Sequence, residues 1–250
     1  MKILNYIERW GKVRSNLLKY IFVEVILSAL IVFSFLINFT PVQASPDRYY
    51  VGYEYYGYNL DTEYAPYGVL GYIVTLSPEI PEASNFLAQW VCVIISYTRQ
   101  YWIQVGYVKS NGLISDTFSF YIEVWDELGY RRSILNIEPE VSTAYRYDIT
   151  GYFSASKGYV WSVGIRKSGE ISDVYRTDVE TYPYESHDLQ AMSEMTSTTI
   201  CINGTHFWDL SYWDGRSWPY WNRHVPEDSL VDPYHLVEVS NHEFYAYGGG

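Results

Sequence analysis

Apolar segments of strand length recur along most of this chain, and turn clusters separate them. Within residues 45–250 no amphipathic stretch of helical period exceeds about three turns. The separating clusters hold turn residues, as in Ser110-Asn111-Gly112 and Asp214-Gly215. Aromatic residues, which favour pleated strands, make up 19% of the chain and include 28 tyrosines. The sequence therefore predicts an all-β protein.

About nine such segments predict a two-layer antiparallel β-sandwich. The expected strands are residues 68–76, 87–96, 101–108, 117–125, 132–137, 144–153, 158–166, 173–182, and 206–212 with 218–221. A Tyr/Gly-rich entry segment, 45–64, precedes the sandwich domain, 65–222, and a polar C-terminal tail, 223–250, follows it. A single core suffices for a domain of this size.

The first 44 residues read as an export signal. Five basic residues lie within residues 1–20, and an apolar run follows at 21–39. The small residues Val42 and Ala44 predict signal-peptide cleavage after Ala44. The alternative is a retained membrane anchor, because the 19-residue run nearly spans a bilayer. Both alternatives predict an extracellular or cell-surface domain, with membrane contact only through residues 21–39.

The exported part is strongly acidic. The whole chain carries 17 Lys and Arg against 29 Asp and Glu, a formal charge of −12. Residues 1–44 hold five basic and two acidic side chains, so residues 45–250 carry −15. This charge disfavours nucleic acid and anionic membrane surfaces as partners.

The two cysteines, Cys92 and Cys201, both fall in the exported part. Export predicts that they form a disulfide, and two free buried thiols are the alternative. Asn203-Gly204-Thr205 is a glycosylation sequon at Asn203. The five histidines lack metal-ligand spacing, and no nucleophile elbow, phosphate loop or dinucleotide fingerprint is present, so we expect no metal and no cofactor.

Polar residues alternate with apolar ones in two neighbouring predicted strands. In the first, Trp102 and Gln104 share one face, while Ile103 and Val105 share the other. The less polar face belongs to the inter-sheet core, so Gln104 is expected on the outer face. In the second strand, Tyr121, Glu123 and Trp125 alternate with Phe120, Ile122 and Val124, which are expected in the core.

If these two strands pair as a hairpin, Gln104 and Glu123 share one aromatic-lined sheet face. An amide, a carboxylate and the rings of Trp102, Tyr121 and Trp125 would then form a groove for an extended peptide or glycan. The alternative is a solvated outer face decorated with cross-strand pairs.

Several of these segments together resemble a peptidase family. Ala83-Ser84, Gln89-Trp90-Val91, Trp102-Ile103-Gln104-Val105-Gly106 and Phe120-Tyr121-Ile122-Glu123-Val124-Trp125 follow in the order of the eqolisin, or glutamic peptidase, motifs. The resemblance covers most of residues 65–215 and implies a concanavalin-like jelly roll. The chain departs from the family pattern at Trp102 and Val105, at Cys92 in the Trp90-Val91-Cys92-Val93 segment, and at Tyr184.

The resemblance implies an acid endopeptidase in which Gln104 supplies the amide of a Gln/Glu pair. Glu185 is the better match for the carboxyl, and Glu180 is the second candidate. Five residues separate these glutamates, so in a regular strand they face opposite sides, and at most one would face Gln104. A weaker resemblance to neprosins leaves their pair incomplete, because they have Glu where this chain has Gln104.

Two further classes of protein share this shape. A glycosidase of this shape needs two carboxylates flanking the scissile bond on one strand face. The segment Glu123–Glu127 does not provide them, because its middle position is Trp125 and Asp126 faces the other way. A non-catalytic glycan-binding or structural sandwich domain is the main alternative to the peptidase.

Overall fold

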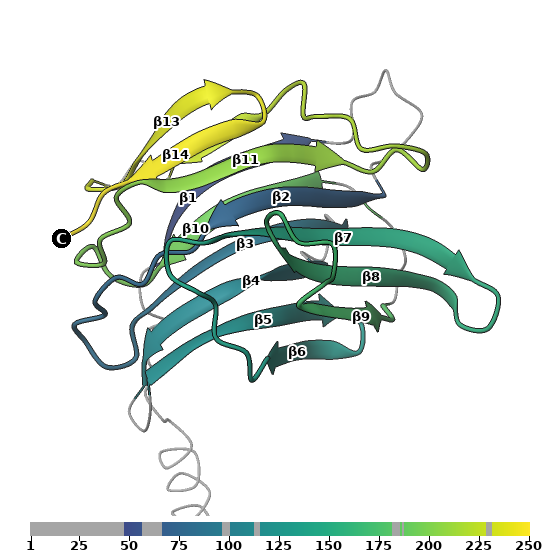
Figure 1. Cartoon of the computed structure of the whole chain (residues 1–250), viewed down its shortest axis with the longest axis horizontal. Helices are drawn as coiled ribbons and strands as arrows, with labels where there is room; N and C mark the ends of the chain where they lie inside the picture. The colour runs from purple at the N-terminus through teal and green to yellow at the C-terminus, as the bar shows by residue number, and fades with distance from the viewer. Residues whose placement is uncertain are drawn as a thin grey trace, which may run out of the picture. The chain divides into compact units, whose positions relative to one another are not determined.

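The chain folds into two antiparallel sheets of seven strands each (Figure 1). The computed structural model describes residues 48–56, 67–96, 101–112, 116–181, 186, 188–228 and 232–250. The strand order is β12-β1-β10-β3-β4-β5-β6 in the first sheet and β13-β14-β11-β2-β7-β8-β9 in the second. None of the described residues forms a helix with the length and apolar character of a membrane span.

Nine strands, β2 to β9 and β11, match predicted segments to within three residues at each end, whereas 218–221 forms only an isolated bridge between Tyr220 and Ser211, and β1, β10, β12, β13 and β14 were not predicted. The first sheet contains β1 (Tyr49–Tyr56), β3 (Phe86–Ser96), β4 (Tyr101–Asn111), β5 (Asp116–Asp126), β6 (Gly129–Ile134), β10 (Asp188–Met195) and β12 (Val225–Asp228). The second contains β2 (Gly68–Val74), β7 (Ala144–Ser154), β8 (Gly158–Lys167), β9 (Tyr175–Val179), β11 (Thr205–Tyr212), β13 (His235–Ser240) and β14 (Glu243–Tyr247). This confirms the predicted all-β sandwich.

The main core lies between the sheets, and it confirms the predicted orientation of β4 and β5. Its members include the five residues expected there: Ile103, Val105, Phe120, Ile122 and Val124. Each is at most 5% exposed. Gln104 therefore points to the outer face of the first sheet, as the alternation predicted.

The sandwich extends beyond residues 65–222 on both sides. Strand β1, within the segment read as an entry, pairs with β10 and β12 and buries Val51 and Tyr53. Strands β12, β13 and β14 come from the segment read as a tail, and β14 buries Phe244. These strands are only four to eight residues long, and aromatic or polar residues on both faces obscure their alternation, so pairing with other strands determines their regular structure.

The expected disulfide is not formed. Cys92 and Cys201 are both free thiols. Cys92 lies on β3 between β4 and β10 and is buried, whereas Cys201 is exposed in the segment between β10 and β11. Asn203 is also exposed, and its Oδ1 accepts a hydrogen bond from the Gly248 N–H at 2.9 Å. Glycosylation of Asn203 stays a prediction.

Gly106 on β4 allows a close backbone approach from β3. A Cβ atom built on Gly106 would lie 1.9 Å from the main-chain oxygen of Gln89 and 2.8 Å from the Cα of Trp90. Both contacts are shorter than van der Waals packing allows. The glycine thus brings β3 and β4 together beside Gln104.

We expect Gly106→Ala to destabilise the fold, because the added methyl group forces two central strands apart. Overpacking of this kind costs about 1–3 kcal/mol, measurable as a lower urea midpoint in equilibrium unfolding. Ser133→Ala on the exposed edge strand β6 is the control and should leave the midpoint nearly unchanged. An unchanged midpoint in Gly106→Ala would contradict the close approach.

Candidate functional site

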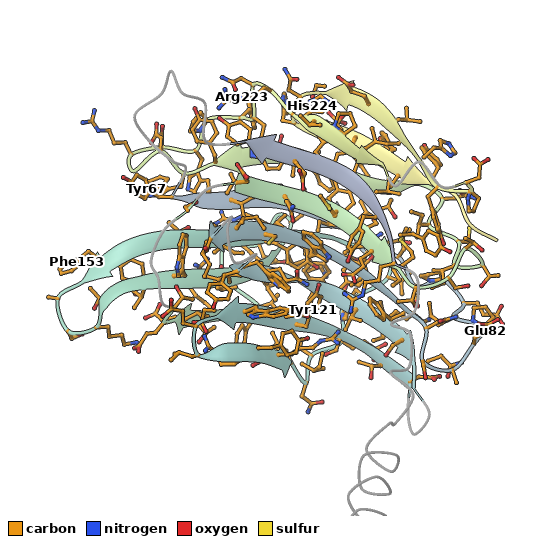
Figure 2. The ribbon with its side chains drawn as sticks, turned by 180° about the vertical axis from the view of Figure 1, so that it is seen from behind. Tyr67, Glu82, Tyr121, Phe153, Arg223 and His224 are labelled. Carbon is orange, nitrogen blue, oxygen red and sulfur yellow. The ribbon has the colours of Figure 1, made fainter. Side chains whose placement is uncertain are left out.

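A pocket of about 430 Å³ opens on the outer face of the first sheet. Its lining comes from β1, β3, β4, β5 and β10 and from Arg48, which precedes β1. In Figure 2, which views the molecule from behind, Tyr121 on β5 lies between Phe153 at one end of the sandwich and Glu82 at the other, and the strands that line the pocket are the five between the edge strands β12 and β6. The pocket is thus built on the middle of a sheet, where neighbouring strands hold each side chain in place.

The base of the pocket is apolar. A second buried cluster lies on this outer face, separate from the main core, and consists of Ala88, Trp90, Cys92, Val108, Tyr121 and Met192. This face is therefore not the solvated surface that the alternative interpretation expected. Polar groups around the cluster are removed from water, which strengthens their electrostatic interactions.

One row of side chains crosses the sheet at the level of Gln104. The registers place the following residues side by side on neighbouring strands: Glu54 on β1, Gln190 on β10, Cys92 on β3, Gln104 on β4, Glu123 on β5 and Arg132 on β6. We call this the Gln104 row. It confirms that Gln104 and Glu123 are cross-strand neighbours on one face.

The Gln104 amide is held by a buried tyrosine. Gln104 is 7% exposed, and its Nε2 donates a hydrogen bond to the hydroxyl of Tyr121 at 2.8 Å. Tyr121 is fully buried, and the guanidinium of Arg132 lies 5.2 Å from the centre of its ring. These contacts fix the amide and leave its second N–H for another acceptor.

Glu123 keeps its proton more tightly than an exposed glutamate. Burial raises the pKa of its carboxyl above the ordinary 4.5, and Arg132 and the Tyr130 hydroxyl oppose that rise. The Arg132 Nε lies 3.7 Å from the Glu123 carboxylate. Among the residues facing Gln104, Glu123 is the carboxyl in direct register with it.

Glu194 on β10 is a second carboxyl of the pocket, which the sequence analysis did not select. Burial raises its pKa, and the effect is opposed by Arg48, the Trp90 indole and Tyr50. The Arg48 guanidinium donates to the Glu194 carboxylate at 2.6 Å. Glu194 lies four residues along β10 from the Gln104 row. Residues 188–191 alternate polar and apolar, but Met192 and Ser193 break this period of two, so the local pattern gave only a short signal for the strand.

The predicted catalytic glutamates are placed differently from Glu123. Glu180 is exposed directly after β9, in the second sheet, and its main-chain oxygen accepts a hydrogen bond from Arg131 at 3.2 Å. It does not line the pocket. Glu185 lies outside the described residues, so its pairing with Gln104 stays a prediction. On β10 the position in the Gln104 row is an amide, Gln190, which donates to the Glu54 carboxylate.

The predicted substrate-binding residues lie around the same pocket. Trp102 and Glu123 line it, Tyr121 supports Gln104, and Trp125 is the cross-strand neighbour of Trp102. Within the described ranges, no three ligating side chains gather as a metal-ion site. The arrangement can therefore offer an amide donor, carboxyl groups of raised pKa and aromatic surface to a ligand.

Comparison with known proteins identifies the fold class. No family model and no curated protein matches the sequence. Crystal structures of scytalido-glutamic peptidase with transition-state analogue inhibitors match with TM-scores of 0.58 and 0.56 at 10% identity. SCP-B, a member of the eqolisin family solved with the tripeptide Ala-Ile-His, matches with a TM-score of 0.53 at 11% identity. Each match covers 82% of this chain and 100% of the other. At these identities the similarity shows the fold alone: the chain is a β-sandwich shaped like the glutamic peptidases.

The raised carboxyl pKa values predict how stability depends on pH. Between pH 4.5 and the raised values, the folded state binds more protons at Glu123 and Glu194 than the unfolded chain does, so these groups lower stability as pH rises. We expect Glu123→Gln and Glu194→Gln each to lose less stability than the parent between pH 4.5 and pH 7.5.

The measurement is the free energy of unfolding from urea titrations at both pH values. Glu170→Gln, in the exposed loop between β8 and β9, makes the same chemical change away from the pocket and should behave like the parent. If both pocket variants showed the parent's pH dependence, the conclusion that burial raises the pKa values of these carboxyls would be wrong.

The two thiols should differ in reactivity. Burial raises the pKa of the Cys92 thiol well above its usual value, and the thiol is shielded from solvent, while Cys201 is exposed. Alkylation of the native, unreduced protein should modify one thiol, at Cys201, and alkylation in denaturant should modify both. Intact-mass analysis distinguishes this result from a disulfide, which would leave both unmodified.

Proposed function

We propose that this protein is an exported peptidase that hydrolyses unfolded polypeptides at acidic pH, using Gln104 and Glu123. The register that sets these two side chains opposite each other at the wall of a sheet pocket carries the proposal. The structural neighbours support a polypeptide as the ligand, since they were solved with peptide-based inhibitors or a tripeptide. Export is supported by the predicted leader.

The chemistry assigns one task to each side chain. The Glu123 carboxylate takes a proton from a water molecule as the water oxygen bonds to the peptide carbonyl carbon. The second N–H of Gln104 donates to the oxyanion that develops on the carbonyl oxygen. The C–N bond then breaks, and the proton held by Glu123 passes to the leaving amine. A glutamine suits this role because its donor is neutral and survives in acid.

The raised pKa of Glu123 sets the acid limb of the pH profile. A general base acts in its ionised form, so turnover should fall as pH drops through a value above 4.5. Glu194, another carboxyl of the pocket, also has a pKa raised by burial, so the pocket becomes more negative as pH rises through the pKa values of both glutamates. A substrate with acidic side chains would therefore be repelled by the pocket at pH values above the acidic range.

The test is cleavage of an unfolded protein by secreted, purified material over pH 3 to 8. Gln104→Ala should lower turnover on the order of a hundredfold or more, because it removes the oxyanion donor. Glu123→Gln should abolish turnover, because it removes the general base while the side-chain volume stays nearly the same. Glu170→Gln is the matched control and should retain full turnover. Circular dichroism and urea midpoints establish that each variant is folded.

The outcomes separate the function from the residue assignment. Full turnover in Gln104→Ala, or no turnover in the parent at any pH, would overturn the peptidase proposal. If Glu185→Gln or Glu180→Gln abolished turnover while Glu123→Gln retained it, the peptidase would stand and the carboxyl would be reassigned to the position that the sequence resemblance implied.

A further inference from the structure

The pocket continues into a row of aromatic side chains next to the Gln104 row. Two residues along each strand, the registers align Asp188 on β10, Ile94 on β3, Trp102 on β4, Trp125 on β5 and Tyr130 on β6. Two residues of a strand span about 7 Å. We call Trp102, Trp125 and Tyr130 the aromatic wall, and Ile94 lies beside it on β3.

The rings of the wall contact one another edge to face. Trp102 and Trp125 have ring centroids 4.9 Å apart at an interplanar angle of 61°, and Trp125 and Tyr130 are 6.2 Å apart at 80°. Trp125 is 42% exposed and Tyr130 is 52% exposed. Single exposed apolar residues are common, but adjoining aromatics at the edge of a pocket indicate a surface that a ligand covers.

Trp102 also has an unused hydrogen-bond donor. Its indole Nε1 is buried and has no hydrogen-bond partner among the described residues. A buried donor without an acceptor is costly, and such groups in folded proteins usually mark a missing partner. Because Trp102 lines the pocket, a carbonyl oxygen of a bound ligand can supply that acceptor.

We propose that the aromatic wall is a specificity subsite for a large apolar side chain of a polypeptide, with the Trp102 N–H donating to a main-chain carbonyl of the same ligand. The cleavage of that polypeptide rests on the proposed function, whereas its binding does not. An extended peptide that presents one carbonyl to Gln104 reaches the wall within two residues, since it advances by about 3.3 Å per residue. The selected residue should therefore lie at a fixed position within two residues of the cleaved bond.

The ring geometry favours a side chain over a sugar. Sugar rings stack on exposed aromatic faces, and an extended glycan needs several such faces in one plane. The angles of 61° and 80° turn neighbouring rings of the wall away from a common plane. Edges and faces of the rings alternate along the wall, which suits a compact apolar group such as Phe or Leu.

The first arm of the test maps cleavage sites in a mixture of unfolded peptides by mass spectrometry. The parent should cut with Phe, Tyr, Trp or Leu enriched at one position, with a preference over Ala of roughly tenfold or more. Trp125→Ala and Trp102→Ala should both lose that enrichment, and Trp125 is the more exposed of the two side chains. Trp102→Phe keeps a ring but lacks the N–H, so it should retain the preference and raise KM for all peptides. Trp218→Ala, in the loop after β11, is the control and should leave the profile unchanged.

The second arm measures binding and does not need turnover. Two blocked peptides that differ only by Phe or Ala at the selected position are titrated into the parent and into Gln104→Ala by calorimetry. If the parent cleaves nothing, the pair is chosen by scanning Phe along an alanine-rich peptide. Tighter binding of the Phe peptide, lost in Trp125→Ala, supports the subsite even if the peptidase proposal fails.

Two results would overturn the subsite. One is equal binding of every Phe peptide and its Ala partner to the parent. The other is a cleavage profile that stays the same in Trp125→Ala and Trp102→Ala while both remain folded. Retention of the parent on an insoluble polysaccharide, lost in Trp125→Ala and not competed by the Phe peptide, would assign the wall to a glycan and also contradict the proposal.

Discussion

The apolar layer between the two sheets determines where every polar group of this protein can lie. Each strand of a two-layer sandwich must give one face to the core, and side chains alternate with a period of two. Ile103, Val105 and Val124 face the core. Their neighbours Gln104 and Glu123 must therefore face outward. The candidate site is thus a consequence of packing as much as of its own residues.

The outer faces of the two sheets differ in how the charges of their buried carboxylates are compensated. On the second sheet, Asp148 is 2% exposed and receives both Arg146 and Arg176, while Arg176 also donates to Asp173 and holds that carboxyl's pKa below its ordinary value. Every carboxyl of this network is matched by a guanidinium, as a structural ion-pair network requires. Such a network compensates its buried charges and leaves little to react.

On the outer face of the first sheet, burial destabilises the carboxylates more than their cationic neighbours stabilise them. Glu123 and Glu194 each have a cationic neighbour, yet burial still raises their pKa values. The apolar cluster beneath them, with Tyr121 and Trp90, excludes the water that would otherwise stabilise their charges. Carboxyls destabilised in this way, next to a fixed amide and an unsatisfied indole N–H, are typical of sites that act on a ligand.

Local pattern in the sequence was enough to determine the β class, most strand positions and the outward direction of Gln104, because alternation and turn residues act over a few neighbours. It also predicted that Gln104 and Glu123 share a face, since a hairpin joins consecutive strands. Only the tertiary structure decided which distant strands flank them. Strand β10, far along the chain, lies beside β3 and brings Gln190 and Glu194 to the pocket, and β1 brings Glu54. The tertiary structure also left Cys92 and Cys201 as free thiols, placed Glu180 outside the pocket beside β9 of the second sheet, and added β1, β12, β13 and β14 to the sandwich. Such contacts depend on which sheet edge each strand joins, and no local spacing encodes that choice.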